Sequence, residues 1–344
     1  MYISHSKPTM NAMDARAVAQ VLKDHHLAQG KKVLEFEHRI SQYVHVKGAV
    51  AVNSGSSALH LALLALGIGR GDEVIVPSFV CSALLNAIFY TQATPRIVDV
   101  HVDDFNICPS LVKKQITKNT KAIIVPHMFG YPADLKELLR LGIPIIEDCA
   151  QALGAEYCGK KVGSFGELSV CSFYATKVLT TAEGGMVLSN QPKLLDKIRD
   201  LREYDNVSSY KPRYNYKMSD VQAALGLSQF LRLPLFLARR KKIALRYDAA
   251  LANLPVTVPA KAKDRDHIYF RYVIKLKKGQ KGLLKELKRK KIEAAVPIYK
   301  PLHRYWGQSQ CPVCDELMKQ SLSIPIYPSL RDVEVRYIIE SLRK

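Results

Sequence analysis

Short runs of β-branched residues alternate with helical segments from about residue 48 onward, and this alternation limits the possible folds more than any other feature. The runs are nearly continuous Val and Ile, which is typical of strands buried on both faces. They are GAVAVNS (48–54), EVIVP (73–77), PRIVDV (95–100), KAIIVP (121–126) and IPIIED (143–148). Because helices join them, the sequence predicts an α/β fold with a mostly parallel sheet covered by helices on both faces.

The chain divides into two parts of different organisation. Residues 1–234 are predicted to form the large α/β domain, in which helices near 11–28 and 32–45 precede the sheet. Residues 235–344 are predicted to form a smaller α+β domain packed on the first, because the segment HIYFRYVIKL alternates like a strand. The expected elements of this part are strand 267–276, helix 280–290, a short strand near 292–296 and helix 332–343, with loops at 255–266 and 297–313.

Lys and Arg are unevenly distributed along the chain. The formal net charge is +20, and residues 235–344 hold 25 Lys and Arg against 10 Asp and Glu. Such an excess suits nucleic acid, an anionic membrane surface or phosphorylated small molecules, or it is simply a solvated surface. The run KRKK at 288–291 has no interleaved aromatic residues, so we expect no nucleic-acid partner.

Membrane and disulfide frameworks are not expected. No apolar run reaches the roughly 18 residues of a membrane span, and the first residues, MYISHSKPTMNAMD, lack the apolar core of a secretory signal. We therefore expect a cytoplasmic protein. The seven cysteines are scattered. Cys311 and Cys314 form one C-x-x-C, which suits a redox pair or half a zinc site, but nothing nearby completes a metal shell and no metal is predicted.

Three features fall at predicted strand ends, where open parallel sheets bind ligands. The first is the segment from Asn53 to Ala58, in which a strand ends, Gly55 permits a turn and a helix begins with Ser56 and Ser57. Unpaired N–H groups and hydroxyls at such a helix start form a phosphate cradle. Plain helix capping by serine is the alternative.

The other two features are an acid and a lysine. Asp148, beside Glu147, closes the strand IPII, and a buried carboxylate is costly unless a cation such as a protonated ring nitrogen meets it. Lys177 is the only charged residue between Glu167 and Glu183. Desolvation lowers the pKa of such an amine and makes it a nucleophile for an aldehyde. The alternatives are an acid that caps the next segment and a lysine that extends to the surface.

Taken together, the three features meet the three needs of pyridoxal 5′-phosphate (PLP). The cofactor requires a phosphate anchor, a carboxylate for its pyridine nitrogen and a lysine for its aldehyde. The cradle at Gly55, the acid at Asp148 and the amine of Lys177 occur in that order along the chain. The sequence therefore predicts a PLP enzyme.

Five sequence blocks, in order and with normal spacing, resemble the DegT/StrS family of sugar aminotransferases. The blocks are VNSGSSALHLALLALGIGRGDEVIVPSF, TKAIIVPHMFGYPADL, IIEDCAQALGAEYCGKKVGSFGE, CSFYATKVLTTAEGGMV and YNYKMSDVQAALGLSQ, and SIPIYPSL near the end also fits. The resemblance covers nearly the whole chain. It implies the type I fold of PLP-dependent transferases and a homodimer with active sites shared across the interface.

The resemblance also implies roles for individual residues. Lys177 is then the Schiff-base lysine, Asp148 pairs with the pyridine nitrogen, and Gln151 lies against the cofactor's hydroxyl edge. The implied phosphate-binding positions are Gly55, Ser56, Ser57 and Ser172, with Asn215 or Lys217 reaching the phosphate from the partner subunit. Relatives more often carry Arg at position 217. Many also place an aromatic residue over the ring where this chain has Cys81, whose thiol packs more weakly.

The implied reaction is a transamination in two half-reactions. An amino donor, glutamate as in the family, supplies the amino group, and a 3-keto or 4-keto sugar on a nucleotide diphosphate accepts it, in aminosugar or surface-polysaccharide biosynthesis. Candidate contacts for these anions are Arg202, Arg213, His303 and Arg304. Two alternatives stay open. One is a sugar dehydratase, against which Lys177 argues because such relatives carry His, and the other is a regulatory or nucleic-acid-binding protein with this fold.

Overall fold

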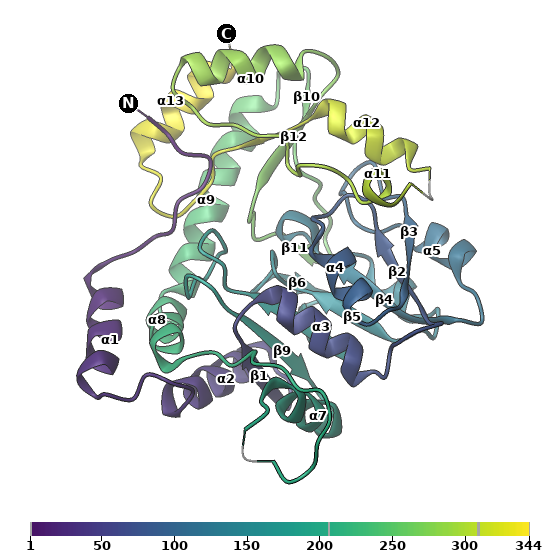
Figure 1. The fold of residues 1–344 in the computed structure, drawn as a ribbon. Helices are drawn as coiled ribbons and strands as arrows, with labels where there is room; N and C mark the ends of the chain where they lie inside the picture. The colour runs from purple at the N-terminus through teal and green to yellow at the C-terminus, as the bar shows by residue number, and fades with distance from the viewer. Residues whose placement is uncertain (1, 206, 308–309, 344) are drawn as a thin grey trace.

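The computed structural model describes residues 2–205, 207–307 and 310–343 (Figure 1). Its main sheet has seven strands in the order β1–β9–β8–β5–β4–β2–β3. Neighbouring strands are parallel except around β9, which is antiparallel to both β1 and β8. The strands are β1 (Gly48–Val52), β2 (Glu73–Pro77), β3 (Thr94–Val98), β4 (Thr120–Pro126), β5 (Ile145–Asp148), β8 (Leu168–Ser172) and β9 (Gly185–Ser189).

Successive residues of these strands point into two different cores. Val50 and Val52 of β1 pack into a core that includes α3, α4 and α7, whereas Ala49 and Ala51 pack into one that includes α2, α5, α6 and α8. The sheet is thus buried on both faces, which explains its near-continuous Val and Ile runs. The predicted α/β fold is confirmed. The helices are α1 (Ala12–Lys23), α2 (Lys31–Val44), α3 (Gly55–Ala65), α4 (Ala83–Tyr90), α5 (Pro109–Gln115), α6 (Leu135–Leu139), α7 (Pro192–Arg202) and α8 (Asp220–Phe230).

The C-terminal part builds a three-stranded antiparallel sheet, β10–β12–β13, around a third core. The start of the chain joins this core, because Ile3 is fully buried there and pairs with Ile292. Strand β11 returns to pair with β6. The division of the chain at residues 234 and 235 stays a prediction. The remaining elements are β6 (Glu156–Tyr157), β7 (Lys160–Lys161), α9 (Leu233–Leu251), β10 (Val256–Thr257), β11 (Arg265–Asp266), β12 (Tyr272–Leu276), α10 (Gln280–Arg289), α11 (His303–Trp306), α12 (Pro312–Gln320), β13 (Ser321–Ile324) and α13 (Asp332–Leu342).

Three local predictions for the C-terminal part are wrong. The strand expected over 267–276 begins only at Tyr272, because Tyr269 takes a left-handed backbone conformation with φ of 53°. The expected loop 297–313 contains α11 and the start of α12. Near 292–296, only isolated bridges form, at Ile292 and Ala295.

Among the described residues, no single helix is both long and apolar enough to span a bilayer. Helices α8 and α9 meet the length and composition criteria only as a pair, and they are bent by 56° at the break between them.

A buried ion pair ties α2 and α7 to the edge strand β1. Arg202 Nη1 donates to Glu37 Oε1 at 2.9 Å and to the Ala51 carbonyl at 2.8 Å. The N–H of Ala51 donates to the same Glu37 oxygen at 2.8 Å. Both charged side chains are buried, so Arg202 is a structural residue. The expectation that it contacts an anionic substrate is therefore wrong.

We predict that Arg202→Met lowers the free energy of unfolding by about 3–5 kcal/mol, because Glu37 then stays buried without its cation. Arg199→Met on the same helix is the matched control. It removes an exposed pair with Asp196 and should change stability by less than about 1 kcal/mol. Urea unfolding followed by circular dichroism measures both. Equal shifts for the two variants would contradict the structural role of Arg202.

Candidate active site

The carboxyl ends of β1, β5 and β8 border one cavity of about 250 Å³. This is close to the lower end of the range of about 300–1,000 Å³ typical of small-molecule sites. The structure brings six of the predicted site residues together on its wall. They are Gly55, Ser56, Cys81, Asp148, Ser172 and Lys177.

The start of α3 forms part of the wall of this cavity. Ser54 caps the helix by accepting from the N–H of Ser57 at 3.1 Å, and the Ser57 hydroxyl donates to Asn53 Oδ1 at 2.7 Å. The Ser57 hydroxyl thus belongs to the cap rather than to the cavity wall. Within the described residues the N–H groups of Gly55 and Ser56 have no acceptor, as expected for the first turn of a helix.

Gly55 permits the close approach of this helix start to β8. A Cβ at position 55 would lie 2.8 Å from Ser172 Cβ and 3.2 Å from Ser172 Oγ. Non-bonded carbon atoms do not pack that closely, so a side chain at position 55 would force a shift of the backbone. The absent side chain leaves the N–H groups of α3 and the Ser172 hydroxyl facing one space, which suits an anion.

Lys177 and Asp148 face the same cavity with opposed charges. Desolvation lowers the pKa of Lys177, the Asp148 carboxylate opposes this shift, and Arg271 adds to it. Desolvation also raises the pKa of Asp148. Two groups oppose this rise: the N–H of Ala150, which donates to Asp148 Oδ1 at 3.0 Å, and the charge of Lys177. The side chain of Lys177 is half-buried. Each group is thus the other's principal charged neighbour.

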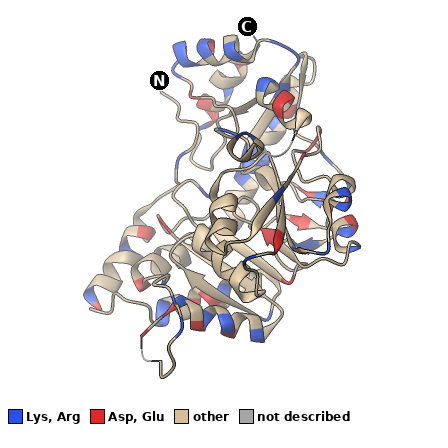
Figure 2. Ribbon diagram, turned by 45° about the vertical axis from the view of Figure 1, so that its right-hand side comes forward, with Lys and Arg blue, Asp and Glu red and all other residues tan. Residues whose placement is uncertain are grey.

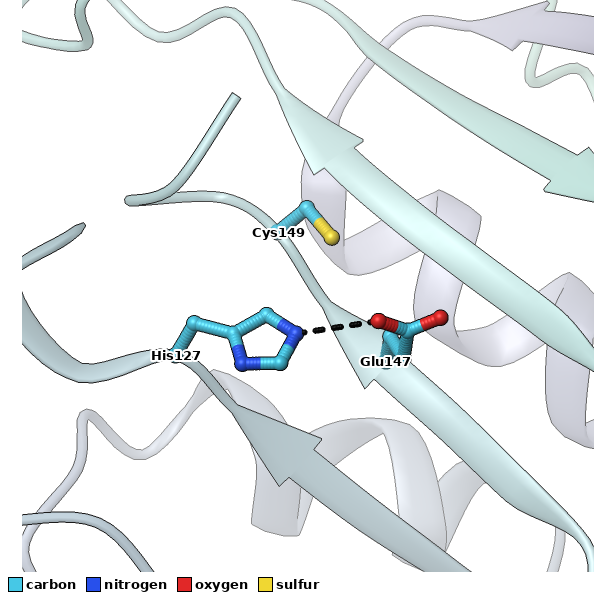
Figure 3. A group of neighbouring side chains, drawn as sticks. All are labelled: His127, Glu147 and Cys149. Carbon is cyan, nitrogen blue, oxygen red and sulfur yellow. Dashed lines mark hydrogen bonds and ion pairs between the residues drawn. The ribbon is translucent and has the colours of Figure 1, made fainter. Parts of the chain in front are cut away.

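A buried hydrogen-bond network supports the acid from behind. Figure 3 shows His127, Glu147 and Cys149 side by side, with His127 Nε2 3.1 Å from Glu147 Oε2. Burial alone would raise the pKa of Glu147, but His127 and the backbone N–H groups around it bring that pKa below its ordinary value. Those N–H groups belong to Gly163, Phe165 and Gly166, each 2.8 Å from a Glu147 oxygen. The network fixes β5, and with it the adjacent Asp148.

These three side chains do not make a metal site, although their ligand atoms lie within 4.8 Å of one another. The N–H of Ala133 donates to His127 Nδ1 at 3.1 Å, so the ring proton resides on Nε2 and points at Glu147. Both carboxylate oxygens of Glu147 already accept two hydrogen bonds each. No imidazole lone pair is left for a cation, and the cluster serves as scaffold.

Other predicted residues lie beside the cavity or away from it. Gln151 Oε1 accepts from the N–H of Phe129 at 2.9 Å, which fixes the side-chain amide and leaves its nitrogen as the free donor. Asn215 lies outside the wall, where its carbonyl accepts from Asn53 at 3.3 Å. Lys217 is also outside it, paired with Glu203 at 3.3 Å and Asp205 at 3.6 Å.

Several wall residues escaped the sequence interpretation. Ser54, Tyr174 and Glu183 line the cavity. Glu183 precedes two glycines, and a Cβ on Gly185 would meet the Ser54 carbonyl. That pair of glycines was the available signal for a close approach of β9 to α3. No sequence pattern marked Arg271, which acts on Lys177 from the C-terminal part.

The C-x-x-C is part of the core. Cys311 and Cys314 are free, buried residues at the start of α12. Burial raises the pKa of both thiols to about 12. They stay protonated at neutral pH, so they lack the reactive thiolate that redox exchange requires.

Residues 8–343 match the model of the DegT/DnrJ/EryC1/StrS aminotransferase family. The GDP-perosamine synthase of Escherichia coli O157:H7 is 35% identical over 359 residues, covering 100% of this chain and 98% of that protein. The chain belongs to this family.

Two further relatives extend over nearly the same length. The spore coat polysaccharide biosynthesis protein SpsC of Bacillus subtilis is 34% identical, covering 99% of this chain and 96% of that protein. The sugar aminotransferase Spr1654 of Streptococcus pneumoniae, in its PLP form, superposes with a TM-score of 0.94 at 30% identity, over 99% of this chain and 97% of that one. This chain is a PLP-dependent sugar aminotransferase with the type I fold, as the sequence predicted.

The residues of the cavity fit PLP. Free N–H groups at Gly55 and Ser56 and the hydroxyl of Ser172 suit its phosphate. An amine of lowered pKa, Lys177, faces a carboxylate, Asp148, across one small space. The donor set thus offers a partner for each polar end of the cofactor.

We predict that Gly55→Ala weakens PLP binding by about 1–3 kcal/mol, because the added methyl group overpacks against Ser172. Affinity for PLP should fall roughly tenfold or more, measured by titrating the apoenzyme and following absorbance. Gly282→Ala is the control, since a Cβ there meets nothing within 4 Å. Unchanged affinity in Gly55→Ala would mean that the phosphate lies elsewhere.

Proposed function

We propose that this enzyme transfers the amino group of glutamate to a keto group of a sugar carried on a nucleotide diphosphate. The observation that carries the proposal is a single cavity that joins Lys177, Asp148 and the free N–H groups at the start of α3. The likeness to a GDP-perosamine synthase and to a polysaccharide biosynthesis protein supports a nucleotide-linked substrate and a role in surface-polysaccharide or aminosugar formation. We propose the cytoplasm as the location, where nucleotide sugars are made available.

In this proposal Lys177 does the proton chemistry. When bound, PLP supplies an aldehyde for amino groups and a ring that accepts an electron pair. Lys177 Nζ would hold the cofactor, would be released when the amino group of the donor takes its place, and would then take and return the proton at the reacting carbon. Because desolvation lowers the pKa of Lys177, its neutral form is populated at a lower pH than that of an ordinary lysine, as a general base requires.

The other wall residues bind and orient. The Asp148 carboxylate keeps a proton on the ring nitrogen, the Gln151 amide nitrogen donates to the hydroxyl edge, and Gly55, Ser56 and Ser172 bind the phosphate. Cys81, which lines the same cavity, would lie over the ring face. Desolvation raises the pKa of Cys81, so its thiol stays neutral and does not compete with Lys177 for the aldehyde.

Arg304 is the favoured contact for the diphosphate among the candidates left open by the sequence. It is exposed on α11, although it also pairs with Asp315. His303 is buried, and its ring nitrogens already contact Ser78 and Asp315. The guanidinium of Arg213 is held by Asp200 at 2.9–3.0 Å.

We predict that the purified holoenzyme is yellow and that borohydride bleaches it and leaves a pyridoxyl group on Lys177, detected by mass spectrometry. Lys177→Ala should lose the colour, and its amino transfer from glutamate to keto sugars should fall by about 10²–10⁴-fold or more. Lys160→Ala, an exposed lysine on β7, is the control and should keep both. UDP-, dTDP-, GDP- and CMP-linked keto sugars are the acceptors to screen. Transfer to none of them would contradict the proposal.

We also propose a homodimer in which Asn215 or Lys217 of one subunit reaches the cofactor phosphate of the other. Neither residue lies on the cavity wall of its own chain, as an arrangement across a two-fold interface requires.

Mixed dimers provide the test of this arrangement. Lys177→Ala and Lys217→Ala proteins should each be inactive or weak alone, but a mixed dimer contains one site that carries neither change if Lys217 acts in trans. Random mixing after mild denaturation should then restore about a quarter of the wild-type activity. No recovery, with mixed dimers verified by differently tagged subunits, would place Lys217 in the site of its own subunit, and a Lys217→Ala protein that is fully active alone would place it outside both sites.

A further inference from the structure

Arg271 carries a positive charge that no acidic side chain neutralises within the described residues. Its Nη1 lies 2.8 Å from His5 Nδ1 and 3.3 Å from His5 Nε2. Burial and the Arg271 charge lower the pKa of His5 to about 3, so His5 is neutral and accepts the hydrogen bond. Two acids, Asp103 and Asp104, line the same small cavity of about 20 Å³ as Arg271, but they pair with Lys275 and Arg265.

One edge of the Arg271 guanidinium remains free. Only Nη1 has a side-chain partner in the described part of the chain, which leaves Nε and Nη2 as an open pair of donors. Neither of these nitrogens is among the buried polar atoms that lack a partner, so both keep some contact with solvent. Two parallel N–H groups of this kind match the two oxygens of a carboxylate.

Arg240 shows what a purely structural arginine looks like here. It is fully enclosed, and its Nη1 donates to the carbonyls of Tyr269, Phe270 and Ile326 at 2.9–3.2 Å. These bonds hold the left-handed turn at Tyr269 that directs the next two residues. Arg240 therefore positions Phe270 and Arg271, and Arg271 itself holds no such set of carbonyls.

Phe270 links Arg271 to the reacting amine. The Arg271 guanidinium carbon lies 5.1 Å from the centroid of the Phe270 ring, and Lys177 Nζ lies 5.2 Å from the same centroid. The proposed function assigns Asp148, the acid that opposes Lys177, to the cofactor ring. Arg271, which flanks the same ring as Lys177 and lowers its pKa, is thus left without an acidic partner among the described residues.

We infer that the free edge of Arg271 binds a carboxylate group of the amino donor. The inference rests on the proposed transamination, in which the donor's amino group must reach the position of Lys177 Nζ. An amino acid that brings its nitrogen there carries a carboxylate a few bonds away. Arg271 would thereby select an amino dicarboxylate, or any α-amino acid, over a simple amine.

The test measures binding without chemistry. Succinate has no amino group, and its binding to the PLP-loaded holoenzyme is measured by isothermal titration calorimetry for the wild type, Arg271→Leu and Arg271→Lys. Arg246→Leu is the matched control, because that arginine pairs with Asp332 on the outer side of α9. Circular dichroism and cofactor absorbance verify that each variant is folded and loaded.

Arg271→Leu should raise the Kd of succinate about 10- to 100-fold, as expected for loss of a charged hydrogen-bond partner. The KM for glutamate should rise in parallel, while cofactor absorbance and keto-sugar binding stay unchanged. Arg271→Lys should fall between the two, because lysine keeps the charge but not the paired donors. If Arg271→Leu weakens the binding of propionate as much as that of succinate, Arg271 contacts the α-carboxylate of the donor. If only succinate binding is weakened, Arg271 contacts the second carboxylate.

Two results would overturn the inference. One is a Kd of succinate in Arg271→Leu equal to that of Arg246→Leu, and the other is a loss of keto-sugar binding with succinate binding retained. If Arg271→Leu does not fold, the same comparison is made with Arg271→Lys. Succinate binding that depends on Arg271 in an enzyme that aminates no keto sugar would support this inference while contradicting the proposed acceptor.

Discussion

The site depends on the opposition of Lys177 and Asp148 across one space at the carboxyl edge of the sheet. Each group is desolvated, and desolvation disfavours the charged form of both. Their mutual attraction favours the charged form of each group, which has no other strong charged partner in the described residues. Such a pair is costly as structure and useful as chemistry, because it provides an amine that is readily neutral and a carboxylate that seeks a cation.

The remainder of the large sheet holds this pair in place. Glu147, the neighbour of Asp148, accepts hydrogen bonds from His127 and from the loop 163–166 with both carboxylate oxygens. These bonds hold the end of β5 from which the Asp148 side chain extends. On the other side, Gly55 and Gly185 let α3 and β9 approach their neighbours without a side chain between them. The cavity therefore keeps its size because the backbones around it are in contact.

Much of the fold and site could be predicted from local sequence. Continuous Val and Ile runs gave the buried sheet, and the isolated Lys177 and strand-end Asp148 were recognisable because their polarity conflicts with apolar surroundings. Features that depend on distant partners could not be predicted. The segment 267–271 alternates like a strand, but Arg240 from α9 donates hydrogen bonds to the carbonyls of Tyr269 and Phe270. Ser57 turns to Asn53 rather than to the cavity, and Arg202 finds Glu37 across 165 residues.

The Lys and Arg residues that give the chain its positive net charge have different physical roles. Figure 2 shows Lys and Arg along the outer helices near the C-terminus, where Lys281, Lys285 and Lys288 of α10 are exposed. Charges of that kind are hydrated and need no partner. Three arginines are removed from this outer surface: the buried Arg202 has a carboxylate partner, the buried Arg240 has backbone carbonyls, and the half-buried Arg271 has only a neutral imidazole among the described residues. Since a partly desolvated cation without an anion costs free energy, Arg271 is the one of these three positions where an anionic ligand would lower that cost.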